Sequence, residues 1–544
     1  MKKFVCENKT LVTLWILCGI ALFIFCGHYG NILSDIGREI YYPERILSGD
    51  ILYKDIFDIY GPFAYLYNAL LYKIFSPNLA VLYFSGILCS FAIVSGVYLI
   101  AKRFLSNFLS FTMGFLTIVT GVCATHLFNF TLPYSYSMLY GTVGFVYAVL
   151  ALIKYNEEKK APYLYLTSML AGFCVANKYD FFIFALLVLL IVLFTKNKRT
   201  ILSCITCFLF VPVICALVLF LQGLRLGDVT GAINYIRDII STDTLNTFYT
   251  VQGIYYNPKI LLFWGEMLLK TLVGFGGLFL GWKLTEKNKI VGYTICTIFT
   301  GLILFFTKPI IFMYLTPLLI LATIAGCKKL KDKTATIFLV LCSLSVCAKS
   351  FWALHPLNYG NYFYTLIITA FLAVLFTFMN KKYEKIVAIG LITIAVNFLY
   401  NSTSSRLNLN NKITTSKGTI YTYVDNADAT QKTINYLKDN NARSALIYPE
   451  GLIINFLANV EADSYYNSLL PLYAESLGEN TFSKRIQEKN IEYIIFNNLS
   501  MKEYGYNHIC DDYAENFCEY VKENYTQTKD INEGLRYIIF QKKN

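Results

Sequence analysis

Residues 31–75 of the chain read NILSDIGREIYYPERILSGDILYKDIFDIYGPFAYLYNALLYKIF, and they follow its first long apolar segment. The stretch carries too many charges for the lipid interior, yet its apolar residues recur too regularly for an ordinary loop. It therefore predicts amphipathic helices that lie at a membrane surface.

Three charged side chains stand near the start of this stretch. Asp35 and Glu39 are four residues apart, a spacing that on a helix places both carboxylates on one face. Arg38, beside them, can hold a carboxylate or a phosphate. Because such a pair can move protons, Asp35 and Glu39 are the candidate catalytic residues. The alternative is a solvated acidic face between two membrane spans.

The composition of the whole chain differs from that of soluble proteins in the direction a bilayer demands. Of its 544 residues, 56% are hydrophobic and 15% are charged, and the mean hydropathy is +0.49. The sequence predicts a mostly α-helical, polytopic membrane protein with about thirteen transmembrane helices. We expect these near residues 11–27, 79–101, 108–125, 134–154, 161–177, 179–195, 200–222, 260–282, 289–306, 309–325, 334–349, 361–379 and 385–400.

Lysines and arginines gather in every second connection between these segments, as in cytoplasmic loops. The net charge of +12 therefore reflects topology and predicts no nucleic-acid partner. With the N-terminus inside and an odd number of spans, the C-terminal tail lies outside the cytoplasm. The pattern predicts a multi-pass protein of the plasma or inner membrane, in contact with its lipids.

The chain divides into two expected domains. Residues 1–400 form the transmembrane domain, with residues 28–78 as its first outer loop, and residues 401–544 have an ordinary, less apolar composition. The tail opens on a polar, linker-like stretch. Beyond it, apolar runs of strand type alternate with helical patterns, which predicts a small extracytoplasmic α/β domain with strands at 445–448, 491–496 and 535–540.

Of the fifteen cysteines, only Cys510 and Cys518 lie in a polar region. They can form a disulfide if that region is outside the cytoplasm. On one straight helix, however, residues eight apart would be too distant for a disulfide.

Two further places in the outer loops carry polar side chains. Lys178 stands in a short outward turn, where it can meet an anionic lipid headgroup; alternatively it is a snorkelling lysine paired with Asp180. Tyr53, Lys54 and Asp55 form a charged loop segment that is either functional or merely solvated.

Several classes of chemistry lack their sequence patterns. The chain has no HExxH metal motif, no glycine-rich nucleotide loop and no GxSxG elbow. The sequence predicts no definite cofactor and no metal ligands, while a divalent metal is left open.

The first outer loop, with Asp35, Arg38-Glu39 and the run ILSGDILYKDIFDIYGPFAYLYNALLYKIF at 46–75, resembles that of membrane-embedded GT-C glycosyltransferases. More narrowly, it is similar to the aminoarabinose transferases, galacturonosyl transferases and protein O-mannosyltransferases. The segment ALIYPEGLIINFLANVEADSYYNSLLP at 445–471 looks like the tail of bacterial members. The resemblance implies an enzyme that moves a sugar from a polyprenyl-phosphate carrier to a lipid, glycan or protein acceptor at the outer leaflet, with inversion.

The resemblance also implies roles for single residues. Asp35 matches the first-loop acid that serves as base or as the carboxylate that positions the acceptor, and Lys178, within GFCVANKYD, matches the lysine that contacts the donor phosphate. A role with Lys178 in binding the donor phosphate is expected for Arg38, a catalytic role beside Asp35 for Glu39, and substrate-binding roles for Tyr53, Lys54 and Asp55. Relatives often have a second acidic residue after the third span, but residues 130–136 contain none.

Two other functions compete with this interpretation. A transporter or flippase for lipid-linked glycans would also have many spans and outer polar patches, although the chain shows no internal repeat. A ligase that transfers a whole lipid-linked glycan needs the same base and phosphate-binding cations.

Overall fold

The computed structural model describes residues 8–251, 258–307, 316–330, 332–347 and 362–543. The helices longer than one turn are α2 (Lys9–Phe25), α3 (Ile36–Leu47), α4 (Phe63–Phe75), α5 (Leu79–Phe104), α6 (Asn107–Thr117), α7 (Tyr136–Glu158), α8 (Ala161–Asn177), α9 (Phe182–Leu193), α10 (Lys198–Gln222), α11 (Leu226–Ile240), α12 (Asp243–Val251), α13 (Lys259–Leu284), α14 (Lys289–Phe306), α16 (Thr316–Gly326), α17 (Lys333–Val346), α18 (Tyr364–Leu375), α19 (Glu384–Leu407), α20 (Val424–Asp439), α21 (Leu452–Ala458), α22 (Pro471–Leu477), α23 (Glu479–Lys489) and α24 (Glu515–Asn524).

The chain is a multi-pass membrane protein. Within the described residues, six helices are long and apolar enough to cross a bilayer, and they coincide with the expected spans near 79–101, 134–154, 200–222, 260–282, 289–306 and 385–400. Most other expected spans correspond to shorter apolar helices, and the one near 161–177 is the seventeen-residue helix α8. Parts of the spans expected near 309–325, 334–349 and 361–379 lie outside the described residues. The count of thirteen therefore stays a prediction.

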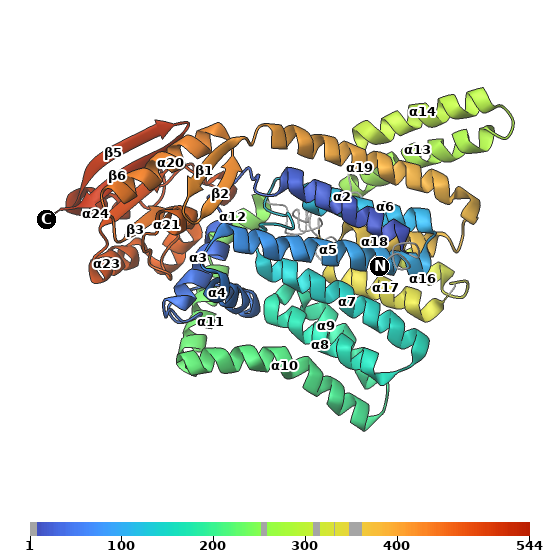
Figure 1. Cartoon of the computed structure of the whole chain (residues 1–544), viewed down its shortest axis with the longest axis horizontal. Coiled ribbons are helices and arrows are strands. Elements are labelled where there is room, and N and C mark those ends of the chain that lie inside the picture. The colour runs from blue at the N-terminus through green and yellow to red at the C-terminus, as the bar shows by residue number, and fades with distance from the viewer. Residues whose placement is uncertain (1–7, 252–257, 308–315, 331, 348–361, 544) are drawn as a thin grey trace.

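Helices α3 and α4, which come from the stretch 31–75, lie between the long helices and the C-terminal part of the chain (Figure 1). Apolar residues such as Ile36 and Ile40 are fully buried in α3, while the helix also carries four charged side chains. The amphipathic helix expected here is therefore present. It packs against α4 on one side and against α21 on the other.

The C-terminal part is an α/β unit at one end of the molecule (Figure 1). Its strands are β1 (Asn411–Thr415), β2 (Gly418–Thr422), β3 (Ala445–Tyr448), β4 (Tyr493–Asn497), β5 (Tyr525–Glu533) and β6 (Leu535–Lys542). The main sheet has the order β3-β4-β6-β5, in which β3 and β4 are parallel and the other neighbours antiparallel. All residues of β3 and β4 are buried, so these two strands form the centre of the unit.

The polar stretch expected as a linker is structured instead. Helix α19 continues to Leu407, past the expected boundary at residue 400, and the hairpin β1–β2 follows it. The hairpin contacts the chain just after α2, because Tyr421 exchanges backbone hydrogen bonds with Gly27 and Tyr29 at 2.7 and 2.9 Å. Its ring also stacks on His28. This contact attaches the C-terminal unit to the start of the first outer loop.

Cys510 and Cys518 form a disulfide, with their Cα atoms 5.7 Å apart. The bridge is possible because Cys510 lies in a loop before α24, so the two cysteines are not on one straight helix.

Candidate active site

The carboxylates of Asp35 and Glu39, which were expected on one face of a helix, have different surroundings at the first turn of α3. Asp35 is not part of the helix; it precedes it with a positive φ of 58°. Its side chain remains about a third exposed, and its Oδ1 lies 2.8 Å from Nη2 of Arg38. Glu39, inside the helix, is fully buried. Of these two carboxylates, only that of Asp35 is accessible to a substrate.

Glu39 belongs to a buried chain of polar groups with Asp58. The Tyr65 hydroxyl lies 2.9 Å from Oε1 of Glu39 and 2.8 Å from Oδ2 of Asp58. Because one hydroxyl has one proton, it can donate to only one carboxylate, so the other carboxyl must carry a proton of its own. Burial raises the pKa of Glu39 to about 7, against a lowering by Arg38 and a further increase from Asp58. Glu39 is therefore protonated to a larger extent near neutral pH than an ordinary glutamate.

The backbone fixes both ends of this chain. The N–H of Tyr136, the first residue of α7, donates to Oε2 of Glu39 at 2.7 Å, and the N–H of Tyr60 donates to Oδ1 of Asp58 at 2.7 Å. The buried acids thus join α3, the loop before α4 and the N-terminus of α7.

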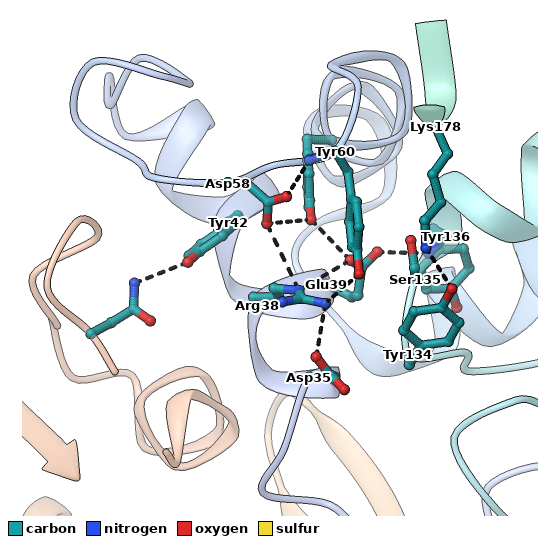
Figure 2. A network of polar contacts seen from close by, with 12 residues as sticks. Asp35, Arg38, Glu39, Tyr42, Asp58, Tyr60, Tyr134, Ser135, Tyr136 and Lys178 are labelled. Carbon is teal, nitrogen blue, oxygen red and sulfur yellow. Dashed lines mark hydrogen bonds and ion pairs between the residues drawn. The ribbon is translucent and has the colours of Figure 1, made fainter. Parts of the chain in front are cut away.

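Arg38 lies at the centre of this group of acids (Figure 2). Its Nε is 3.7 Å from Glu39 and 3.8 Å from Asp58, and its Nη2 donates to the Tyr60 hydroxyl at 3.3 Å. Nε itself has no hydrogen-bond partner among the described residues, although it is buried. An unsatisfied buried donor is rare in proteins and is consistent with a binding site for an anion.

Lys178 directly follows α8 and is 1% exposed. Its Nζ donates to the Tyr134 hydroxyl at 2.5 Å, lies over the Tyr60 ring at 4.1 Å and over the Tyr134 ring at 4.5 Å, and is 3.7 Å from Asp180. A snorkelling lysine would extend its ammonium group into water, whereas this group is enclosed by aromatic rings.

Tyr60 brings the two cations together, because Arg38 also lies over its ring, at 4.9 Å. Gly61 makes this possible. A Cβ at Gly61 would lie 2.2 Å from the carbonyl oxygen of Ala176, and the Gly61 N–H donates to Asn177 at 2.8 Å. The loop can therefore touch the end of α8 only with glycine at this position. The structure thus brings Lys178 to Arg38, which pairs with Asp35 and Glu39, although Lys178 is far from all three in the sequence.

Tyr53, Lys54 and Asp55, the predicted substrate-binding residues, have surroundings different from those of Asp35 and Lys178. Tyr53 and Lys54 line a groove of about 340 Å³, together with Gly227 and Asp228 of α11 and with Tyr465 and Tyr466 of the C-terminal unit. The Tyr53 hydroxyl donates to the carbonyl oxygen of Tyr60 at 2.5 Å. This bond links the groove to the cation site, by which we mean Arg38, Lys178 and the Tyr60 ring that both contact. Asp55 accepts a hydrogen bond from the Ile51 N–H at 3.0 Å and thereby closes a local turn.

The structure adds residues that the sequence did not assign to the site. Asp58 and Tyr65 complete the buried acid chain, and Tyr60 and Tyr134 enclose Lys178. The segment 130–136, where an acid was missing, thus supplies a tyrosine. Glu450 approaches Asp35 from the C-terminal unit. The position of Asp58 in a charged outer loop left it open as either functional or solvated, and only the density of tyrosines could have indicated Tyr60, Tyr65 and Tyr134. No local signal indicated Glu450.

Among the residues that the structure describes, no group of three or more His, Cys, Asp and Glu side chains could hold a metal ion. We therefore derive no step through a metal.

No protein-family model matches the chain, and no curated protein sequence matches it. Among solved structures, it is similar to the oligosaccharyltransferase of Archaeoglobus fulgidus, with 12% identity and a TM-score of 0.49 over 90% of this chain and 68% of that one. It is also similar to ArnT from Cupriavidus metallidurans, with 8% identity, in the apo state (TM-score 0.47, 97% of each chain) and bound to undecaprenyl phosphate (TM-score 0.45, 99% of this chain and 98% of that one). None of these scores reaches 0.5, so the assignment of function rests on the chain's own residues.

Proposed function

We propose that the chain is an integral membrane glycosyltransferase of the GT-C type, which moves a sugar from a polyprenyl-phosphate carrier to a lipid, glycan or protein acceptor of the cell envelope. The observation that carries this proposal is the site on α3. There a partly exposed carboxylate, Asp35, pairs with Arg38, and Arg38 shares the ring of Tyr60 with the buried ammonium group of Lys178.

These groups suit a transfer reaction that needs no nucleotide. Asp35 takes the proton from the acceptor hydroxyl or amine, while the acceptor atom forms a bond to the anomeric carbon. The bond from that carbon to the phosphate oxygen breaks, and the polyprenyl phosphate leaves with the electron pair. Arg38 and Lys178 hold the departing phosphate, which gains charge in this step. An in-line attack inverts the anomeric centre.

We assign Glu39 an indirect role, in contrast to Asp35. Its carboxyl is enclosed and bonded to Tyr65 and to the backbone of Tyr136, so it keeps α3 and α7 in place around Arg38. Burial raises the pKa of its carboxyl to about 7, so Glu39 carries only part of a negative charge at neutral pH.

The acceptor side is the groove at Tyr53 and Lys54. It combines half-exposed tyrosine rings, Tyr465 and Tyr466, with the charged side chains of Lys54, Asp228 and Arg485. Ligand sites typically combine apolar walls with a few polar groups. Tyr53 connects the groove to Tyr60, so an acceptor bound there lies toward the cation site.

We place the C-terminal unit outside the cytoplasm, on the outer side of the cell membrane. The disulfide supports this placement, because disulfides persist in oxidising compartments. A reporter fused after Asn401 should behave as extracytoplasmic, and an active cytoplasmic reporter there would contradict the placement.

The function itself is tested by reconstitution. Purified protein in liposomes is supplied with polyprenyl-phosphate monosaccharides labelled in the sugar, together with a crude envelope acceptor fraction. We expect label in the acceptor fraction without any nucleotide sugar. Transfer that requires a nucleotide sugar would contradict the proposal.

A further inference from the structure

One wall of the groove at Tyr53 and Lys54 consists of small residues. It comes from α11, where Gly227, Gly231 and Ala232 line the groove. A Cβ at either glycine would meet nothing within 4 Å, and neither glycine has a positive φ, so neither packing nor backbone geometry requires glycine there. Glycine inside a helix is destabilising relative to alanine. The two glycines therefore lower the stability of α11 and leave room for a ligand.

The C-terminal unit contributes two adjacent tyrosines to the same groove, Tyr465 and Tyr466. Their ring centroids lie 5.1 Å apart. Both of their backbone N–H groups donate to Oδ1 of Asp463, at 2.9 and 3.2 Å, and Oδ2 of Asp463 accepts from Nε of Arg485 at 2.5 Å. The loop that carries the two rings is thus held in place before a ligand binds, which lowers the entropy cost of binding.

Polar atoms along the groove are available to a ligand. The hydroxyls of Tyr465 and Tyr466 have no hydrogen-bond partner among the described residues. Asp228 accepts the Arg225 N–H through Oδ2 at 2.8 Å, and its Oδ1 has no such partner in the same part of the chain. Lys54 is exposed, and no ion pair joins it to another described residue. The groove therefore combines aromatic rings with hydrogen-bonding groups that the protein itself does not use.

A sugar ring matches this combination of groups. Its hydroxyls lie around the rim, where they can form hydrogen bonds with charged side chains, which are stronger than bonds between neutral groups. The C–H groups on its two faces are attracted to the negatively polarised face of an aromatic ring. An extended peptide, in contrast, often binds by pairing with the free edge of a strand. Every residue that lines this groove lies in a helix or a loop.

The other face of α11 shows on which side the groove opens. Leu226, Ile233 and Ile240 recur at intervals of seven residues, on the side of the helix away from Gly231 and Asp228, and all three are exposed. An apolar helix face of this kind suits the surface of a bilayer. Helix α11 also begins shortly after α10, which is long and apolar enough to cross one. The groove therefore opens away from the lipid chains, which disfavours an acyl chain as its ligand.

We propose that the acceptor is a glycan, and that the groove binds one of its sugar rings against Tyr465 and Tyr466, with hydrogen bonds from its hydroxyls to Lys54 and Asp228. This inference rests on the proposed function and names the class of its acceptor. The recognition chemistry is the same for a free polysaccharide and for the sugar headgroup of a glycolipid.

The test is a binding measurement that involves no transfer. Sugar chains are released from the crude envelope fraction of the transfer assay, labelled at their reducing ends and titrated against the full-length protein in detergent. Tyr465→Ala and Tyr466→Ala should each weaken binding about 3- to 10-fold, as for the loss of an aromatic contact. The matched control is Tyr520→Ala, on α24, because Tyr520 is partly exposed and lies outside the groove. It should bind as the parent does.

A second variant closes the groove and leaves both tyrosines unchanged. Because a Cβ at Gly231 meets nothing within 4 Å, Gly231→Leu should fold, and its side chain should block the sugar ring, so that most of the binding is lost. Gly276→Leu, on α13, is its control, since a Cβ there also meets nothing within 4 Å. Polyprenyl phosphate should bind to all these variants as it does to the parent.

Intact glycolipids and free polysaccharide from the same fraction are titrated separately, and binding of either one identifies the source of the glycan. Peptides released from the fraction by a protease are titrated in parallel. If peptides bind and sugar chains do not, the acceptor is a protein and the inference is wrong. Sugar binding that Tyr465→Ala, Tyr466→Ala and Gly231→Leu all leave unchanged would equally contradict it.

The proposed function fails in a different way. If the parent binds polyprenyl phosphate but none of the sugar chains, the acceptor is not a glycan, while the proposed transfer reaction stands. If the parent binds no polyprenyl phosphate, the proposed function is wrong, and the role of the groove as an acceptor site is wrong with it.

Discussion

The two ends of α3 carry the same kinds of charged side chain and use them differently. At its start, Asp35 and Glu39 surround Arg38, whose Nε stays without a hydrogen-bond partner among the described residues. At its end, Arg45 contacts Asp50 and Glu461, both at 2.9 Å. An unsatisfied cation can still bind a ligand, whereas a satisfied one only holds the structure together.

The end of α3 is a docking surface for the C-terminal unit. The backbone N–H of Ala462 donates to the Tyr41 hydroxyl at 2.7 Å, the Asn467 amide donates to Tyr42 at 3.0 Å, and Lys417 pairs with Glu44 at 2.5 Å. Charged side chains in an outer loop therefore do not by themselves indicate a catalytic site. The two ends differ in hydrogen bonding: Nε of Arg38 is buried without a hydrogen-bond partner among the described residues, whereas Nε of Arg45 donates to Asp50 at 2.9 Å.

The largest expected effect is at the start of the helix. Asp35→Asn should lower the rate of sugar transfer by about 10²- to 10⁴-fold, because a general base is lost. Binding of the donor should stay close to that of the parent, since the cations are unchanged. Transfer at the parental rate would remove the distinction between the two ends of α3.

The second largest effect is expected when the enclosed ammonium group of Lys178 is removed. Lys178→Met keeps most of the side-chain volume, and donor affinity should fall by about 10- to 100-fold, as for a lost hydrogen bond to a charged group. Lys178→Arg should retain part of the affinity, since the charge stays but its geometry changes. As a control, Lys432→Met, on the surface of the C-terminal unit, should bind donor normally. Unchanged affinity in Lys178→Met would assign Lys178 to structure alone.

A smaller effect concerns stability and pH at Glu39. Its folded-state pKa of about 7 lies above the ordinary value of 4.5, so the folded protein binds more protons and loses stability as the pH rises through this window. The slope is at most about 1.4 kcal/mol per pH unit for one proton. Glu39→Gln should flatten the change in melting temperature between these pH values. An equal slope in the variant would place the proton elsewhere, for example on Asp58.

The smallest effect is expected at the end of α3. Glu461 is 59% exposed, and an exposed ion pair contributes about 0–1 kcal/mol. Glu461→Gln should therefore shift the melting temperature slightly and leave transfer unchanged. A loss of transfer comparable to that of Asp35→Asn would show that the docking surface takes part in the reaction.

The sequence predicted those helices and strands that a local pattern of apolar and polar residues determines. The amphipathic helix at α3, many of the apolar helices and the strands β3, β4 and β6 followed from periodicity and composition. Strand β5 was missed because most of its residues are exposed and polar, so no alternation marked it. The hairpin β1–β2 was taken for a linker because most of its residues are polar. Its strands pair with each other, bury Ile413 and Ile420, and contact Tyr29.

At the site, the sequence identified Asp35, Arg38 and Lys178 as candidates but not their arrangement. The spacing of Asp35 and Glu39 suggested one face, yet the positive φ of Asp35 turns it out of the helix. The contact of Lys178 with Tyr60 depends on Gly61 and on the end of α8, which are far apart in the chain. Long-range packing of this kind leaves no periodic signal in a single sequence.

The central claim is that the site on α3 holds a polyprenyl-phosphate sugar donor, and the most direct measurement is mass spectrometry of the lipid that co-purifies with the protein. The account predicts a polyprenyl phosphate that carries one sugar, and less of it in Lys178→Met. A polyprenyl carrier with a whole oligosaccharide would favour a ligase or a flippase instead. The complete absence of polyprenyl lipids, from the parent protein as from Lys178→Met, would contradict the claim.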